Sequence, residues 1–135
     1  MIHHIDFAVT DFERSRAFYV DALAPLGIGL VMDIERDNGR RLAGFGLSPD
    51  PTFWIRTGNG IGGRLHVAFL ANSRGAVDGF HEAALRAGGT DNAGPGCGRG
   101  TQRTTTPRSC LIRMATTLKR SAVVRNDTRY VVPAA

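Results

Sequence analysis

The sequence predicts an α+β fold made of two tandem βαβββ modules within a single domain, residues 1–135. The main observation is an internal repeat, because residues 4–27 align without a gap on residues 66–89. Each copy opens with a histidine and a strand pattern, continues through a polar helix cap and ends at a glycine. A repeat of this length indicates one supersecondary unit used twice. The identical pairs are His4 and His66, Phe7 and Phe69, Phe18 and Phe80, Ala22 and Ala84, Leu23 and Leu85, and Gly27 and Gly89.

The composition favours one soluble domain. The chain has 135 residues, of which 42% are hydrophobic, and this is enough to bury a core. No apolar run approaches the length of a membrane span, and Met1 leads directly into a strand pattern rather than a signal peptide. We therefore expect a cytoplasmic protein with no membrane partner.

The basic charge of the chain is confined to its last third. Residues 1–92 contain 9 Arg and 11 acidic residues, a net charge of −2, whereas residues 93–135 contain 8 basic residues and 1 acidic residue, a net charge of +7. The break divides the chain into module one (1–60), module two (64–92) and an aberrant tail (93–135). Because the excess belongs to the tail alone, we do not expect the protein to bind nucleic acid.

The first copy alternates apolar and polar residues at its start. Its apolar residues are expected to face the core, which leaves His4 and Asp6 on the opposite sheet face. The next segment repeats apolar residues at helical spacing and is expected to end at Pro25 and Gly27. Further expected elements are strands at 30–36, 41–46 and 53–56, a hairpin turn at Asn38-Gly39, a loop at 48–51 and a second helix at 73–87.

The segment between the modules, residues 58–63, contains a formal G-x-G-x-x-G match. A dinucleotide site needs this motif between a strand and a helix, so that the helix N-terminus meets the pyrophosphate. Here a strand follows the motif. We therefore interpret the segment as a flexible linker between modules.

The two repeated histidines are candidate metal ligands. His66 occupies the position of His4, and two sheets related by a pseudo-two-fold axis would bring both imidazoles to one metal ion. The alternative is that both are partly exposed side chains at strand ends. His3 is expected on the helix side of its strand and His81 at the helical position of Tyr19, so neither is a predicted ligand.

The segments HIDFAVTDFERSRAFY and HVAFLANSRGAVDGFHEAALRAGG, with the two-module layout, resemble the vicinal oxygen chelate superfamily over residues 1 to about 92. This superfamily includes glyoxalase I, bleomycin-resistance proteins and extradiol dioxygenases. The resemblance implies a cup around a divalent metal (zinc, nickel, manganese or iron), with His4 and His66 as ligands. It also implies a small-molecule substrate and a homodimer.

The resemblance further implies a glutamate ligand from the last strand, after an Asp-Pro-Asp-Gly turn. This sequence lacks the turn and has no glutamate after Glu82. With permitted codons from residue 97 onward, the frame that starts one nucleotide earlier contains Asn-Tyr-Tyr-Ala-Ala-Phe-Val-Leu-Asp-Pro-Asp-Gly-Asn-Asn-Val-Glu-Ala-Val, which is the missing ending. We hypothesise that one base was lost near Ala93 and that residues 93–135 are translated in a shifted frame.

The alternative is a genuine basic Arg/Thr tail that binds nucleic acid or an acidic partner. Under the frameshift hypothesis, Cys97 and Cys110 have no selected role. Short, loosely packed strands are expected at 109–114, 122–124 and 129–132. An unpaired edge is expected on the second sheet.

Two functions are compatible with the resemblance. One is an ancestral metal-dependent lyase, isomerase or dioxygenase that acts on a small oxygen-chelating substrate and is impaired here because its third ligand is missing. Asp6 would lie in its substrate cavity, either as a base or as a solvated carboxylate. The other is a metal-free drug-binding protein of the bleomycin-resistance kind. Trp54 and Phe53 would line its cup or, alternatively, belong to the core.

Overall fold

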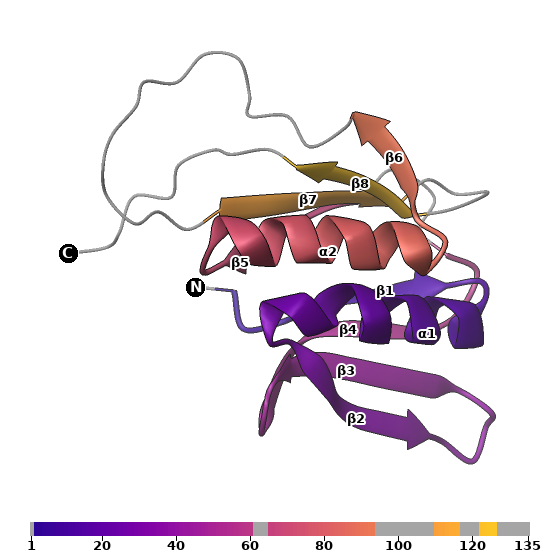
Figure 1. Cartoon of the computed structure of the whole chain (residues 1–135). Helices are drawn as coiled ribbons and strands as arrows, with labels where there is room; N and C mark the ends of the chain where they lie inside the picture. Colours follow the sequence, from indigo (N-terminus) through magenta and orange to yellow (C-terminus); the bar gives the residue numbers. More distant parts are fainter. Residues whose placement is uncertain (1, 61–64, 94–109, 117–121, 127–135) are drawn as a thin grey trace.

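The computed structural model describes the backbone of residues 2–60, 65–93, 110–116 and 122–126, and the side chains of residues 2–60, 65 and 67–90. The described residues form an α+β arrangement of two four-stranded sheets and two α-helices (Figure 1). In chain order the elements are β1 (Ile5–Val9), α1 (Phe12–Leu23), the short 3₁₀ helix η1 (Ala24–Leu26), β2 (Gly29–Glu35), β3 (Arg41–Leu47), β4 (Asp50–Thr57), β5 (Leu65–Ala71), α2 (Arg74–Arg86), β6 (Thr90–Ala93), β7 (Cys110–Thr116) and β8 (Ala122–Asn126).

The first sheet has the order β1-β4-β3-β2, in which β1 is parallel to β4 and the other pairs are antiparallel. The predicted hairpin is confirmed, because Gly39 has φ 74° and its N–H donates to the carbonyl of Arg36 over 2.8 Å. The predicted loop at 48–51 is shorter than expected. Strand β4 already begins at Asp50, so Ser48 and Pro49 alone form the turn.

Helix α1 begins as the sequence predicts but ends differently. The Asp11 carboxylate accepts a hydrogen bond from the N–H of Arg14 over 3.1 Å, which caps the first turn. Pro25 does not end the helical path. It lies near the start of η1, where the backbone N–H of a helix has no intrahelical acceptor, so the missing N–H of proline costs nothing. The helical path ends at Gly27, whose φ of 75° is left-handed.

Helix α2 is capped by Ser73, whose side chain accepts from the N–H of Ala76 over 3.1 Å. It ends at Gly88, which has φ 94°, and the N–H of Gly89 then donates to the carbonyl of Ala84 over 2.8 Å. The repeat alignment paired Gly27 with Gly89. The structural equivalent is therefore Gly88, one residue earlier, because η1 adds a residue to the first copy.

The two helices pack against each other on one side of the sheets (Figure 1). Helix α2 also packs on η1, where a Cβ at Gly79 would lie 3.2 Å from the Cβ of Pro25. The two halves of the chain also share aromatic packing, since the rings of Phe53 and Phe69 have centroids 5.1 Å apart. The buried side chains of both halves form one core, namely Phe7, Val9, Phe12, Phe18, Tyr19, Ala22, Leu23, Ala43, Phe45, Phe53, Ile55, Val67, Phe69, Ala71, Val77, Phe80 and Ala84.

The second sheet is built differently from the first. Its order is β5-β7-β8-β6, with β5 antiparallel to β7 from Leu65 opposite Thr116 to Ala71 opposite Cys110, and β6 parallel to β8. The sequence did not predict β6, and the predicted strand at 129–132 lies outside the described residues. In the order found, β5 and β6 are the outer strands of this sheet, and the expectation of unpaired backbone groups at its edge stays a prediction.

Candidate functional site

The first sheet has one face against the helices, and the residues of its other face are mostly half-buried or exposed within the described part of the chain. Phe53 and Ile55 of β4 point to the helix side and are buried, whereas Trp54 and Arg56 alternate with them and are half-buried. The register adds the residues of neighbouring strands to the same side. We call this surface the open face; it comprises Asp6, Ala8, Met32, Ile34, Leu42, Gly44, Trp54 and Arg56.

Asp6 lies on the open face, as the sequence predicts, and it has a partner there. Its Oδ2 accepts from Nε of Arg56 over 3.2 Å, and both side chains keep more than a third of their surface exposed. The pair joins neighbouring strands, since Arg56 lies opposite Ala8 on β1. The sequence interpretation offered a base or a solvated carboxylate and did not include this guanidinium. An anion and a cation are thus presented together on an otherwise largely apolar surface.

Phe53 and Trp54 lie on opposite faces of the sheet. Phe53 is 4% exposed and belongs to the core. The Trp54 indole lies on the open face, where its Nε1 donates to the carbonyl of Pro51 over 3.2 Å. The ring passes over Gly44, because a Cβ at that position would lie 2.8 Å from Cη2 of Trp54. Trp54 is thus an aromatic surface held in place by a backbone contact and a glycine.

His4 immediately precedes β1 and is exposed. Its Nδ1 lies 3.0 Å from Nδ1 of His3, with the two rings nearly perpendicular. The sequence interpretation placed His3 on the helix side and did not anticipate its contact with His4. Alternation of side chains holds only within a strand, and β1 begins one residue later, at Ile5.

The backbone of His66 lies in β5 opposite Ala115, while its side chain lies outside the described part of the chain. The convergence of His4 and His66 on a metal therefore stays a prediction. Among the described residues, no group of three or more His, Cys, Asp and Glu side chains is placed to hold a metal ion. The described residues thus do not supply the complete ligand set that the resemblance implies.

His81 occupies the helical position that the repeat predicts for it. It is buried in α2, and Tyr19, its counterpart in the repeat, is buried in α1. Both therefore belong to the layer between helices and sheets.

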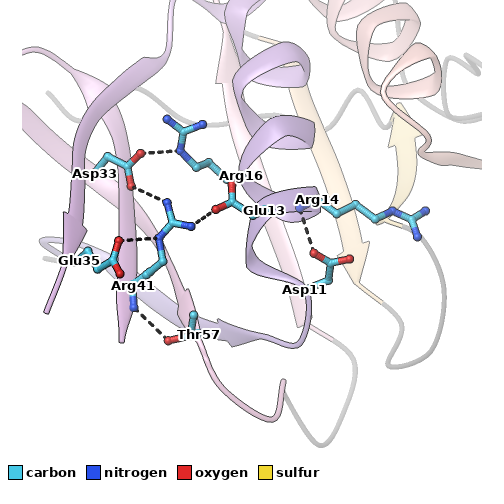
Figure 2. A network of polar contacts seen from close by, with 8 residues as sticks. All are labelled: Asp11, Glu13, Arg14, Arg16, Asp33, Glu35, Arg41 and Thr57. Carbon is cyan, nitrogen blue, oxygen red and sulfur yellow. Dashed lines mark hydrogen bonds and ion pairs between the residues drawn. The ribbon is translucent and has the colours of Figure 1, made fainter. Parts of the chain in front are cut away.

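A network of charged side chains lies on the helix side, at the start of α1 (Figure 2). Arg41 of β3 forms ion pairs with Glu13 of α1 and with Asp33 and Glu35 of β2, and Arg16 of α1 lies 2.6 Å from Asp33. The Arg41 guanidinium also lies over a core ring, that of Phe12. The sequence analysis missed this network, which joins α1 to the sheet. It does not border the open face.

Comparison with known proteins identifies the family. The sequence profile of the Glyoxalase/Bleomycin resistance protein/Dioxygenase superfamily matches residues 1–111. The chain belongs to this superfamily. The match extends past residue 92, where the sequence likeness was expected to end, and stops within β7. None of the curated proteins compared with the chain matched it significantly.

Solved structures of superfamily proteins resemble the fold. A glyoxalase/bleomycin resistance protein from Albidiferax ferrireducens T118 gives a TM-score of 0.60 at 23% identity, covering 93% of this chain and 97% of that chain. The V278E and E144Q mutants of glyoxalase I from Zea mays each give 0.57 at 18% identity, covering 91% of this chain. The chain spans less than half of the maize protein, of which 43% is covered. In the described part of the chain, no helix is long and apolar enough to cross a membrane.

Proposed function

We propose that this superfamily member descends from a divalent-metal-dependent enzyme that acts on a small oxygen-chelating substrate in the cytoplasm, and that its present form is impaired. The observation that carries the proposal is the open face, which presents the Asp6–Arg56 pair and the Trp54 ring together. An apolar surface with a few convergent polar groups is the usual composition of a small-molecule site. Arg56 would bind an anionic oxygen of the substrate, and Trp54 would cover its apolar part.

The metal of the ancestral site would be zinc, nickel, manganese or iron, held by His4 and His66 and by one carboxylate. Such an ion supplies Lewis-acid stabilisation of an enolate or related oxyanion. This sequence has no glutamate after Glu82 to complete the set. We therefore expect the family-type site of the present chain to bind metal weakly.

The proposal includes the domain organisation expected from the sequence: module one at 1–60, module two at 64–92 and a frameshifted tail at 93–135. The strand arrangement supports it. In the first sheet the opening strand β1 pairs in parallel with the last strand β4, whereas in the second sheet β5 pairs antiparallel with β7. A second copy of the module would pair β5 with β8. The segment after α2 thus forms strands, but in another order and direction.

The gene sequence tests the frameshift directly. Around codon 93, the frame one nucleotide earlier is expected to continue without a stop through an Asp-Pro-Asp-Gly turn and a glutamate. If that frame is interrupted by a stop codon or encodes an unrelated sequence, the frameshift hypothesis is wrong.

Metal titration tests the function. Calorimetry with Zn²⁺, Mn²⁺, Ni²⁺ and Fe²⁺ is compared between the present chain and a chain with the restored base. We expect the restored chain to bind metal, with an affinity that falls at least about tenfold in His4→Ala and in His66→Ala. In the present chain we expect little metal binding that depends on His66. Equal His66-dependent affinity in both chains, or a restored chain indifferent to both substitutions, would refute the site.

A metal-free drug-binding function is the alternative, and the position of Trp54 favours it. An indole on an open sheet face is suited to stack on an aromatic or cationic ligand. The test is titration of EDTA-treated protein with bleomycin, followed by the fluorescence of this single tryptophan. Saturable binding that is lost in Trp54→Leu would support sequestration. No saturable change in emission would leave the enzyme ancestry as the better proposal.

The expected homodimer is also part of the proposal. Met32 on the open face and Leu70 of β5 are large apolar side chains that are 43% and 54% exposed. A second copy of the chain would cover them. Sedimentation velocity is expected to give a dimer that dissociates in Met32→Lys; a monomer at micromolar concentration would contradict this.

A further inference from the structure

Two ring nitrogens are brought together just before β1. The Nδ1 atoms of His3 and His4 lie 3.0 Å apart, and the ring planes cross at 87° with centroids 5.2 Å apart. Both side chains are exposed, so solvent and dissolved ions reach them. Two imidazole nitrogens at this separation either share one proton in an N–H···N hydrogen bond or direct two lone pairs at a common ion.

The separation is short enough for a chelating pair, although the two nitrogens now point at each other, with ring centroids 5.2 Å apart, and both rings would have to turn toward a common ion. With metal–nitrogen bonds of about 2.0–2.1 Å, two nitrogens 3.0 Å apart subtend an angle of about 95° at the ion. This angle is close to the right angle between neighbouring ligands in square-planar and octahedral complexes and smaller than a tetrahedral angle. Square-planar coordination by nitrogen is typical of Cu²⁺ and Ni²⁺, and Cu²⁺ binds nitrogen ligands more tightly than other divalent first-row ions.

We propose that His3 and His4 form a bidentate copper site at the entrance to β1. The site uses Nδ1 of both rings, and water fills the remaining positions because both side chains are exposed. One ring of the free pair carries the shared proton on Nδ1. On binding, that proton moves by way of solvent to Nε2 of the same ring, so a neutral pair binds the ion without net proton release.

This site is distinct from the one under the proposed function. Both include His4, but the family-type site needs His66 and not His3, whereas the copper site needs His3 and not His66. The two can therefore be separated by substitution. Failure of one leaves the other standing.

The experiment is calorimetric titration with Cu²⁺. It uses the 135-residue chain carrying Cys97→Ser and Cys110→Ser, so that thiols neither reduce nor bind the ion. His3→Ala, His4→Ala and His66→Ala are made in this background, with circular dichroism to confirm folding. We expect His3→Ala and His4→Ala each to weaken binding at least about tenfold, because each removes the chelate, and His66→Ala to leave it unchanged. Electron paramagnetic resonance is expected to show hyperfine coupling to two equatorial nitrogens in the parent and one in each single variant.

Three results would overturn the proposal. Unchanged affinity in His3→Ala would mean that the close approach is a hydrogen bond only. Loss in His3→Ala with full binding in His4→Ala would assign the copper to His3 and the amino end of the chain. Loss in His66→Ala equal to that in His4→Ala would assign it to the family-type site.

Discussion

At the scale of single residues, the position of Trp54 depends on a missing side chain. The indole lies over Gly44, and a Cβ there would approach Cη2 of Trp54 to 2.8 Å. Gly29, in the edge strand β2, has no atom within 4 Å of its corresponding Cβ position. Gly44 and Gly29 therefore serve as test and control positions in the same sheet: the space beside Gly44 is occupied by Trp54, whereas the space beside Gly29 is empty.

We predict that Gly44→Ala displaces the indole and lowers the free energy of unfolding by about 1–3 kcal/mol, the usual cost of overpacking. Gly29→Ala is expected to change it by less than about 0.5 kcal/mol. Urea unfolding followed by tryptophan emission measures both, since the chain has one tryptophan. A native emission maximum unchanged by Gly44→Ala would contradict the contact.

At the scale of elements, the end of α2 is fixed by Gly88, whose φ of 94° strains any side chain. We predict that Gly88→Ala destabilises the protein by about 1 kcal/mol or more. Gly75→Ala, in the first turn of the same helix, is expected to be neutral or to stabilise by up to about 0.5 kcal/mol, because its Cβ would meet nothing closer than 3.9 Å. Thermal unfolding of both variants checks the difference; equal shifts would show that Gly88 does not end the helix.

The Arg41 network sets how α1 lies on the sheet. Removing the arginine takes from Glu13 and Glu35 the ion pair that each makes with it, whereas Asp33 keeps its pair with Arg16. We predict that Arg41→Met costs about 1 kcal/mol at low salt and less at 1 M salt, since these groups are partly exposed and screened. The methionine keeps an apolar contact with the Phe12 ring, so the charge is what the comparison measures.

Arg74→Met is the control for Arg41→Met. It breaks an exposed pair with Asp78 one helical turn away, which is typically worth about 0.3–0.5 kcal/mol. Urea unfolding at two salt concentrations measures both variants. A loss in Arg41→Met that is no larger than in this control, or that does not change with salt, would contradict the role given to the network.

At the scale of the whole molecule, the two sheets differ in the sequences that build them. The strands of the first sheet contribute alternate side chains to one aromatic core. The strands β7 and β8 come from the basic Arg- and Thr-rich segment. We predict that amides of β7 and β8 exchange with deuterium earlier than those of β3 and β4, because their sequences contain no aromatic residue, whereas β3 and β4 bury Phe45 and Phe53 in the core. Uniformly slow exchange along both sheets would show the prediction to be wrong.

The features that the sequence predicts correctly are those that depend on residues close together in the chain. The caps Asp11 and Ser73, the Asn38-Gly39 turn and the alternation in β1 and β5 all follow from local chemistry, and the structure contains each of them. The superfamily was recognised on the same segments.

What the sequence could not supply depends on partners far along the chain. The pairing of β5 with β7 joins residues 51 positions apart, Leu65 and Thr116, and no local pattern specifies it. The Arg41 network joins three elements at once. The contact of His3 with His4 was missed for the opposite reason, because strand alternation was extended to residues that precede the strand.

The parallel pairing of β1 with β4 also has a consequence for biosynthesis. Ile5 lies opposite Phe53, which is made 48 residues later. At about 5–20 residues per second, the first strand waits roughly 2–10 s for its partner to be translated. During this time α1 is the nearest cover for its apolar face, through contacts such as that of Phe7 with Tyr19. Ribosome-bound chains of increasing length are therefore expected to protect β1 from proteolysis only after β4 has emerged.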